Sequence, residues 1–213
     1  MMDNTYSLRR KEIVKDEPLV AQVQERRHAL FFVPQIESEF ARLTSVNLKE
    51  VFFSGLDQYL DRFLELFKAK SGLPELTKLT RALDNSTHTK RTILLLGLSH
   101  FLRDDALAKT VEATEDEGVF CKGMKVGLVM VKDGEEIVDV SVILKEAVVL
   151  TDLKDIPSAV AMLMGLLYCL NIDYPKNQKY TFEVIQKVFM NIGGGQCSSL
   201  VHGLRNRLLR KTM

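Results

Sequence analysis

The segment Asp155-Ile-Pro-Ser-Ala-Val-Ala-Met-Leu-Met-Gly-Leu-Leu-Tyr-Cys-Leu170 decides how the rest of the chain is arranged. Every position from 159 to 170 is apolar or small, so a helix here has no polar face and needs other elements on all sides. Asp155 is a suitable N-cap, and Pro157 fits in the first turn, where its missing N–H would have no partner anyway. The apolar run is about a dozen residues long, whereas a helix needs roughly 20 to span a bilayer core. We therefore expect a helix buried inside a globular core.

A second stretch, Arg91-Thr-Ile-Leu-Leu-Leu-Gly-Leu-Ser-His-Phe-Leu102, is also apolar on nearly all sides. We expect it to form the other central helix and to pack against residues 157–170. Helical spacing of apolar residues predicts further helices, about seven in all with the central pair. These further segments are 35–44, 48–70, 75–83, 177–192 and 200–211, with 106–113 as an additional short candidate.

The hydrophobic period changes after Gly123 and predicts strands. Apolar residues alternate with their neighbours over 124–130, and residues 137–144 are rich in Val and Ile. Asp133-Gly134, between the two runs, supplies residue types that tolerate the positive φ of a tight hairpin turn. We expect an antiparallel hairpin, with residues 147–151 as a candidate third strand, because two strands alone bury too little surface to be stable.

These elements predict an α+β fold that is mostly helical and forms a single compact domain over residues 28–213. The ordinary globular composition, 46% hydrophobic and 27% charged, agrees with one sizeable core. Residues 1–27 mix charges of both signs with few aromatic residues, and Glu17-Pro18 interrupts any regular pattern. We expect this segment to be a flexible charged arm.

Charge and cysteine content limit the classes of function. The chain has 29 Lys and Arg against 28 Asp and Glu, a net charge of +1, so binding to nucleic acid or anionic lipid would have to be local. The N-terminal residues lack the apolar region of a secretory signal, and no apolar run is long enough to anchor the chain. Three scattered cysteines, Cys121, Cys169 and Cys197, fit reduced thiols. We expect a cytoplasmic or nuclear protein without a membrane partner.

Two groups of short motifs look familiar. The first group is His28-Ala-Leu-Phe-Phe, Glu39-Phe-Ala-Arg-Leu-Thr44, Leu56-Asp-Gln-Tyr59 and Leu64-Glu-Leu-Phe67-Lys-Ala-Lys-Ser-Gly72. The second group is Asp155-Ile-Pro-Ser-Ala159, Leu166-Leu-Tyr168, Leu170-Asn-Ile-Asp-Tyr174-Pro-Lys176 and Thr181-Phe182. Together they resemble the C-terminal region of sterile alpha motif domain-containing protein 3-like proteins, over residues 28–205. This uncharacterised family implies no catalytic residues, and the segment before residue 28 is too short for a sterile alpha motif domain, so we expect no interaction through that domain.

Cys197 with His202 is the sharpest chemical candidate, because a thiol beside a glycine-rich turn and a helix start is activated when an imidazole pairs with it. Their spacing of five does not place them on one helix face. A structural cysteine is the favoured interpretation, and a cysteine-dependent enzyme stays an alternative. For Gly193-Gly-Gly195, a left-handed helix stop is favoured over a phosphate loop, because no GxxxxGK[ST] motif is present.

No other pattern indicates chemistry. Ser99 and His100 lie in an apolar helical run rather than in a GxSxG elbow, so they are expected at the core or its boundary. The four histidines are scattered and no CxxC or HExxH occurs, so neither a metal site nor a cofactor is expected.

The end of the chain is locally basic and amphipathic, with no acidic residue after Glu183. Its basic residues suit phosphates, but it lacks aromatic residues that would stack on bases, so nucleic acid is not favoured. Its leucines at intervals of four suit the groove of a partner. The candidate partner surface is therefore Arg205, Arg207, Arg210, Lys211, Leu200, Leu204 and Leu208.

The sequence favours a non-catalytic intracellular module for protein–protein interaction or regulation, with an unknown protein partner. Association with nucleic acid through the basic C-terminal helix is the first alternative. An enzyme that uses Cys197 is the second.

Overall fold

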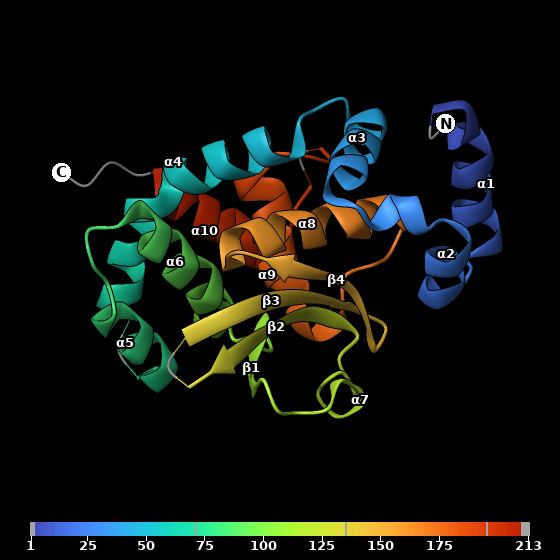
Figure 1. The fold of residues 1–213 in the computed structure, drawn as a ribbon. Coiled ribbons are helices and arrows are strands. Elements are labelled where there is room, and N and C mark those ends of the chain that lie inside the picture. The colour runs from blue at the N-terminus through green and yellow to red at the C-terminus, as the bar shows by residue number, and fades with distance from the viewer. Residues whose placement is uncertain (1–2, 71, 135, 195, 210–213) are drawn as a thin grey trace.

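Four strands form one mixed sheet in the order β1-β2-β3-β4 (Figure 1). The computed structural model describes residues 3–70, 72–134, 136–194 and 196–209. Strand β1 runs parallel to β2, and the β2–β3 and β3–β4 pairs are antiparallel. The strands are β1 (Ala108–Glu112), β2 (Val126–Asp133), β3 (Glu136–Leu144) and β4 (Ala147–Leu153).

The predicted hairpin is confirmed as β2 and β3, with Gly134 at φ +64° in the turn. The candidate third strand is confirmed as β4. The short helix proposed for residues 106–113 is wrong, because this segment contains β1, which pairs Ala108 with Leu128 of β2. Only Val111 of β1 is buried. A single inward-facing residue leaves no clear period, and the parallel partner lies far along the chain, so the local pattern does not reveal the strand.

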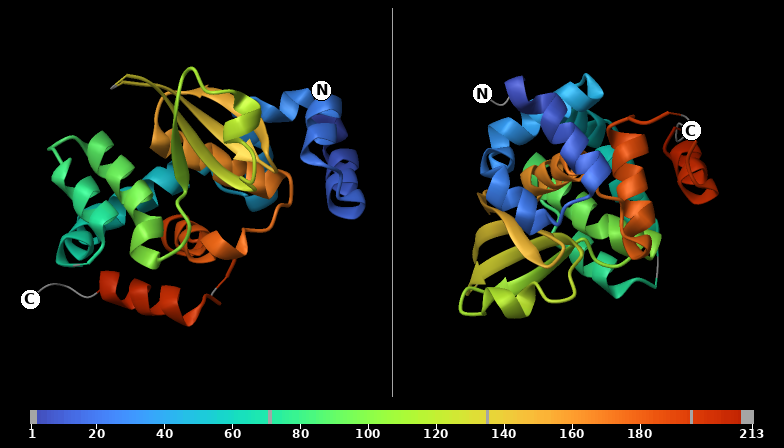
Figure 2. Two further views of the ribbon diagram at one scale, coloured as in Figure 1. Left: turned by 90° about the horizontal axis from the view of Figure 1, so that it is seen from below. Right: turned by 90° about the vertical axis from the view of Figure 1, so that its right-hand side faces the viewer.

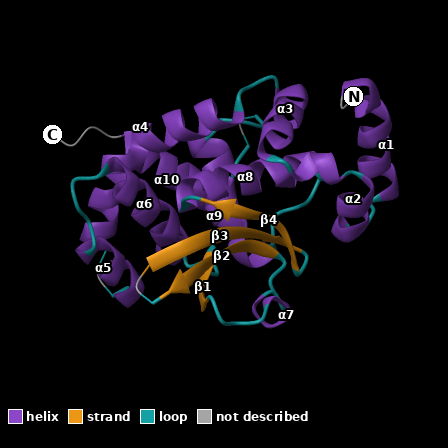
Figure 3. Cartoon of the chain, in the orientation of Figure 1, coloured by secondary structure: helices purple, strands orange, loops and turns teal. Residues whose placement is uncertain are grey.

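Helices make up most of the remaining chain (Figure 3). The class prediction, α+β and mostly helical, is confirmed, although the structure has more helical elements and one more strand than expected. The α-helices are α1 (Tyr6–Asp16), α2 (Val20–Arg26), α3 (Val33–Thr44), α4 (Leu48–Ala69), α5 (Pro74–Arg81), α6 (Thr87–Leu102), α7 (Glu117–Phe120), α8 (Ile156–Cys169), α9 (Lys179–Val184) and α10 (Ser199–Leu209). Short 3₁₀ turns are η1 (Asp3–Thr5), η2 (His28–Phe31) and η3 (Lys176–Gln178), and η4 (Ile185–Phe189) is a π-helical turn.

Helix α8 is the central helix that its sequence predicts. All its residues except Ser158 and Tyr168 are buried, and Asp155 caps its start by accepting a hydrogen bond from the Ser158 backbone N–H at 2.7 Å. It lies against strands β2, β3 and β4 on one side and against α3, α4 and α6 on the others. Its contact with α6 confirms the predicted pair of central helices.

The sheet separates a large core from a small one. Leu128, Val140 and Val142 face α8 and belong to the large core, whereas Val129 and Ile143, on the opposite face, pack with Phe120 of α7. The alternation follows from the twofold period of a strand, which points successive side chains to opposite faces. In Figure 2 the sheet lies on one side of the helical layer, with α1 and α2 at one end of the molecule and α5 at the other.

Residues 6–26 form helices α1 and α2, whereas the sequence predicted a flexible arm. Ile13, Val20 and Val23 are buried in the large core. Glu17-Pro18 interrupts the regular structure, as predicted, but helices lie on both sides of it. Glu17 closes α1 in the left-handed conformation, with φ 44°, and Pro18 lies in the connection to α2. Only a few apolar positions form the buried face of these helices. Among the many charged residues of the segment, these positions do not give a recognisable helical pattern in the sequence.

The predicted helix over residues 177–192 is interrupted by the π-helical turn η4. Here the backbone N–H of Met190 donates to the carbonyl of Ile185 at 2.9 Å, five residues back. Helix α4 passes so close that a Cβ built on Gly55 would lie 1.8 Å from the carbonyl oxygen of Phe189. Gly55 therefore permits a close approach of α4 to the widened turn, a contact between distant segments that local spacing does not show.

Candidate functional site

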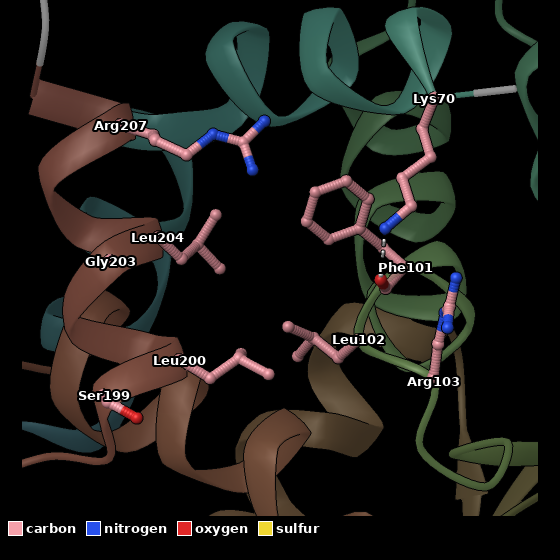
Figure 4. A pocket seen from close by; sticks show the side chains of 9 residues that line it. All are labelled: Lys70, Phe101, Leu102, Arg103, Ser199, Leu200, Gly203, Leu204 and Arg207. Carbon is pink, nitrogen blue, oxygen red and sulfur yellow. Dashed lines mark hydrogen bonds between the residues drawn. The ribbon is translucent and has the colours of Figure 1, made fainter.

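A groove lies between α10 and the C-terminal ends of α4 and α6 (Figure 4). Its volume is about 420 Å³. We call it the α10 groove. It combines an apolar floor with basic side chains at its rim. The lining residues are Lys70, Phe101, Leu102, Arg103, Ser199, Leu200, Gly203, Leu204 and Arg207.

The floor of the α10 groove is fixed by the core beneath it. Phe101, Leu102 and Leu204 are buried, and the ring of Phe101 packs at 5.2 Å from that of Phe67. Leu200 lies on the side of α10 that faces the groove and is 41% exposed. Figure 4 shows Leu200 and Leu204 pointing from α10 towards Phe101 and Leu102 across the groove. The floor is therefore rigid, and Leu200 offers apolar surface to solvent.

Lys70 follows the last residue of α4, and its side chain reaches the C-terminal end of α6. Its Nζ donates to the carbonyl oxygen of Phe101 at 3.4 Å and lies 4.7 Å from the centre of the Phe101 ring. The last carbonyls of a helix have no partner within it and carry partial negative charge, so a lysine is favourable there. The contact with the ring adds a cation–π interaction. Lys70 is thus held at the rim by two contacts that leave its charge unneutralised.

Two arginines complete the rim. Arg103 follows α6 in the left-handed conformation, and its backbone N–H bonds to His100 and Ser99 carbonyls, while its side chain is exposed. Arg207 is exposed on α10. None of the described residues that line the groove is acidic. The described part of the groove therefore carries three positive charges and no negative one, which favours an anionic ligand.

Helix α10 is oriented by its start and by its inner face. The hydroxyl of Ser198 accepts from the Val201 N–H at 3.3 Å, and the Ser198 N–H donates to a carboxylate oxygen of Glu183 in α9. Val201, Leu204 and Leu208 are buried. Hydrogen bonds fix the start of α10, and its buried face packs against the core. This orientation leaves the opposite face of α10 and its side towards the groove accessible to solvent.

The orientation of α10 places the residues of the predicted partner surface in different environments. Leu204 and Leu208 face the chain's own core, so the expectation that all three leucines meet a partner is wrong, and Leu200 alone of them is exposed. Arg207 lines the α10 groove, whereas Arg205 is half-buried beside Cys197. Arg210 and Lys211 lie outside the described residues.

Sequence reasoning missed Lys70 and Arg103, which join Arg207 from positions far along the chain. Each follows the end of a helix, where a basic residue is ordinarily explained by the helix dipole. Their convergence depends on the docking of α10, which no local pattern reveals.

Cys197 and His202 do not line a common site. Cys197 is half-buried in a separate hollow of about 230 Å³, which Lys187 and Arg205 also line and His202 does not. The Nδ1 of His202, on the exposed face of α10, lies 3.4 Å from the Nδ2 of Asn206. Gly193 and Gly194 have φ of +85° and +76°, as predicted for a left-handed helix stop.

The remaining candidate residues have structural surroundings. Ser99 is fully buried and His100 lies at the boundary of the core, as expected. Burial raises the pKa of the Cys169 thiol well above its ordinary value, and its Sγ lies 3.8 Å from the Ile36 carbonyl oxygen. Within the described ranges, no group of three or more His, Cys, Asp or Glu side chains is arranged to hold a metal ion. Nor does any helix in that part of the chain combine the length and apolarity that crossing a membrane requires.

The N-terminal helices are joined to the core by two arginines of α1. Arg9 pairs with Glu39 of α3 in a fully buried contact. Arg10 reaches the C-terminal end of α8, where its guanidinium donates to the Tyr168 carbonyl at 3.4 Å and to the Asn171 side chain at 3.2 Å. Arg10 thus places a positive charge at the C-terminal end of the central helix, where the helix dipole favours it.

A family model described as "Sterile alpha motif domain-containing protein 3, helical domain" matches residues 1–32. The chain resembles sterile alpha motif domain-containing protein 3-like proteins. The matched segment spans α1, α2 and η2, which includes Arg9 and Arg10. It meets the motifs that suggested this resemblance only at residues 28–32. Comparison with curated proteins and with solved structures gives no match.

Proposed function

We propose that this chain is a non-catalytic protein-interaction module, and that the α10 groove binds an acidic amphipathic helix of a partner protein. The observation that carries the proposal is the coincidence of an apolar floor with a rim of Lys70, Arg103 and Arg207, where none of the described lining residues carries a carboxylate. An amphipathic helix places apolar anchors at i, i+3 and i+4 in such a groove. Carboxylates beside those anchors would meet the three cations.

The size and the lining of the groove favour a protein segment over a nucleic acid as its ligand. Its volume of about 420 Å³ suits a few side chains. Single-stranded nucleic acids bind extended basic channels with exposed aromatic rings on which bases stack. The aromatic residue here, Phe101, is only 6% exposed and packs against Phe67. The exposed Leu200 instead offers the apolar contact that a partner side chain buries.

The test uses peptides selected for binding to the full chain from a random peptide library. We expect the selected peptides to carry apolar residues at helical spacing flanked by Asp and Glu. The double substitution Arg103→Gln/Arg207→Gln should weaken their binding roughly tenfold or more, since each charge-assisted hydrogen bond contributes about 1.5–3 kcal/mol. Fluorescence anisotropy measures the dissociation constants.

The matched control is Lys78→Gln/Arg81→Gln, which removes two exposed positive charges from α5, outside the groove. It should leave the dissociation constants within about twofold, since exposed charges that do not line the groove make no direct contact with the peptide and are screened by salt. Equal losses in both variants would show a general charge effect and refute the groove. Tighter binding of a single-stranded oligonucleotide than of any peptide, lost in the groove variant, would favour the nucleic-acid alternative.

A further inference from the structure

A second basic hollow is lined by residues next to α7 and by the start of β1, elements labelled in Figure 1. It has a volume of about 780 Å³. Four separate segments form its walls. They are the start of β1, the residues between α7 and β2, the β3–β4 turn and the segment that precedes α9.

Five lysines converge on this hollow, which we call the lysine hollow. They are Lys109, Lys122, Lys125, Lys145 and Lys176. Two carboxylates also line it, those of Asp105 and Asp173. The hollow therefore carries a surplus of positive charge in a chain whose net charge is only +1. Such a local surplus in a concave surface attracts anions although the molecule as a whole does not.

The five lysines lack carboxylate partners in the part of the chain that the structure describes. Among the described residues, none of the five forms an ion pair with a carboxylate. Asp105 is bound instead by Asn177, whose Nδ2 donates to its carboxylate and whose carbonyl accepts its backbone N–H at 2.8 Å. Like charges that face one another repel, so an anion placed between them relieves an unfavourable interaction.

Backbone hydrogen bonds hold two of the lysine-bearing segments together. The N–H of Lys145 donates to the carbonyl of Lys125 at 2.6 Å, and the N–H of Glu146 donates to that of Met124 at 3.0 Å. The carboxylate of Glu146 accepts from the Gly123 N–H at 2.7 Å. Lys145 and Glu146 both have positive φ, 52° and 66°, in this tight turn. The positions of Lys125 and Lys145 are thus set by the fold before any ligand arrives.

We propose that the lysine hollow binds a small anion that carries several phosphate groups. Lysine ammonium groups bind phosphate oxygens as point charges, and several phosphates are needed to engage lysines from four walls. The volume of the hollow lies in the range of small-molecule sites. The same chemistry is offered by a soluble inositol polyphosphate and by the headgroup of a phosphorylated lipid.

Calorimetric titration of the full chain with inositol hexakisphosphate tests the proposal. We expect the wild-type chain to bind this polyphosphate. The triple substitution Lys122→Ser/Lys125→Ser/Lys145→Ser should weaken that binding at least roughly tenfold, since the loss of one charge-assisted hydrogen bond already has an effect of that size. The matched control Lys15→Ser/Lys78→Ser/Lys154→Ser removes three exposed lysines outside the hollow and should retain the wild-type affinity. Thermal unfolding of each variant shows that the fold is kept.

Further arms separate the ligand sources. One arm measures whether the chain sediments with phosphatidylcholine vesicles that contain a phosphorylated inositol lipid. If the wild-type chain sediments with them and the triple variant does not, the ligand of the hollow is a lipid headgroup. Binding of the soluble polyphosphate without sedimentation assigns it to a free ligand. The groove variant Arg103→Gln/Arg207→Gln should bind the polyphosphate normally, so this proposal and the proposed function fail independently. Absence of polyphosphate binding, an equal loss in the control variant, or tighter binding of an oligonucleotide overturns it.

Discussion

The guanidinium of Arg9 and the carboxylate of Glu39 form an ion pair that excludes solvent from both partners. Arg9 Nε lies 2.9 Å from Oε1 and Nη2 lies 2.5 Å from Oε2, and the two residues are 0% and 1% exposed. Arg42 shares the carboxylate at 2.9 Å. The pair joins α1, in the segment that resembles the helical domain, to α3. The attachment of α1 to α3 therefore includes a buried ion pair.

We expect Glu39→Gln to lower the free energy of unfolding by about 3–5 kcal/mol, because removing one member of a buried pair leaves the other charge uncompensated. Glu37→Gln is the control on the same helix, since the Glu37–Lys49 pair is partly exposed and should contribute less than about 1 kcal/mol. Urea denaturation measures both. Similar losses in the two variants would show that the buried pair has no special role.

The contact of Gly55 with Phe189 gives a second prediction. A Cβ at position 55 would lie 1.8 Å from the Phe189 carbonyl oxygen, so Gly55→Ala must separate α4 from the π-helical turn. We expect a loss of about 3 kcal/mol in the free energy of unfolding, at the upper end of ordinary overpacking. Gly203→Ala, where no atom lies within 4 Å, should instead gain about 0.5–1 kcal/mol because alanine favours a helix. Thermal unfolding that ranks the two variants in the opposite order would contradict this geometry.

The sequence predicts the centre of the fold better than its periphery. Residues 156–169 are apolar at nearly every position, and a helix with no polar face has only one environment that satisfies it. The hairpin is equally well marked, because Asp133-Gly134 separates two runs of period two. In contrast, α1 buries the charged Arg9 beside a single apolar residue, Ile13, so its inward face looks like a solvated one. Strand β1 and the π-helical turn depend on partners distant in sequence, Leu128 and Gly55, that no local pattern identifies.

The candidate site could be predicted only in part for the same reason. Arg207 was identified because the end of the chain lacks acidic residues, and this signal is local. Lys70 and Arg103 belong to other helices, and only the docking of α10 through Val201 and Leu204 brings them together. The leucine spacing correctly indicated an apolar face, but it could not show that this face meets the chain's own core.

The two leucines of α10 that line the groove should separate stability from binding. Leu204 is 4% exposed, so Leu204→Ala should cost about 2–5 kcal/mol of unfolding free energy through lost burial and a cavity. Leu200 is 41% exposed, so Leu200→Ser should change stability by no more than about 0.5 kcal/mol. Leu200→Ser should nevertheless weaken binding of groove-selected peptides in fluorescence anisotropy. Unchanged peptide affinity would remove Leu200 from the binding surface.

Tyr168 and Tyr174 predict a loss of stability in alkaline solution. Burial raises the pKa of both phenols above the ordinary value, and the neighbouring Tyr168 raises that of Tyr174 further. Gln186 Nε2 lies 2.6 Å from the Tyr168 hydroxyl, and the Tyr174 ring stacks on Phe182 at 5.0 Å. These contacts hold both half-buried tyrosines against the core.

The sign follows from proton binding in the two states. Above about pH 10 an unfolded tyrosine loses its proton while the folded protein retains it, so the unfolded state is favoured as pH rises. The stabilisation is complete below that pH and decreases above it, by up to about 1.4 kcal/mol per pH unit for Tyr174 and by less for the more exposed Tyr168, which solvent screens. Tyr174→Phe keeps the stacked ring and removes the titrating hydroxyl, so its unfolding free energy should fall less steeply with pH than that of the wild type. Urea denaturation at a series of alkaline pH values measures the slopes, and identical slopes would mean that Tyr174 ionises in the folded state as it does in the unfolded chain.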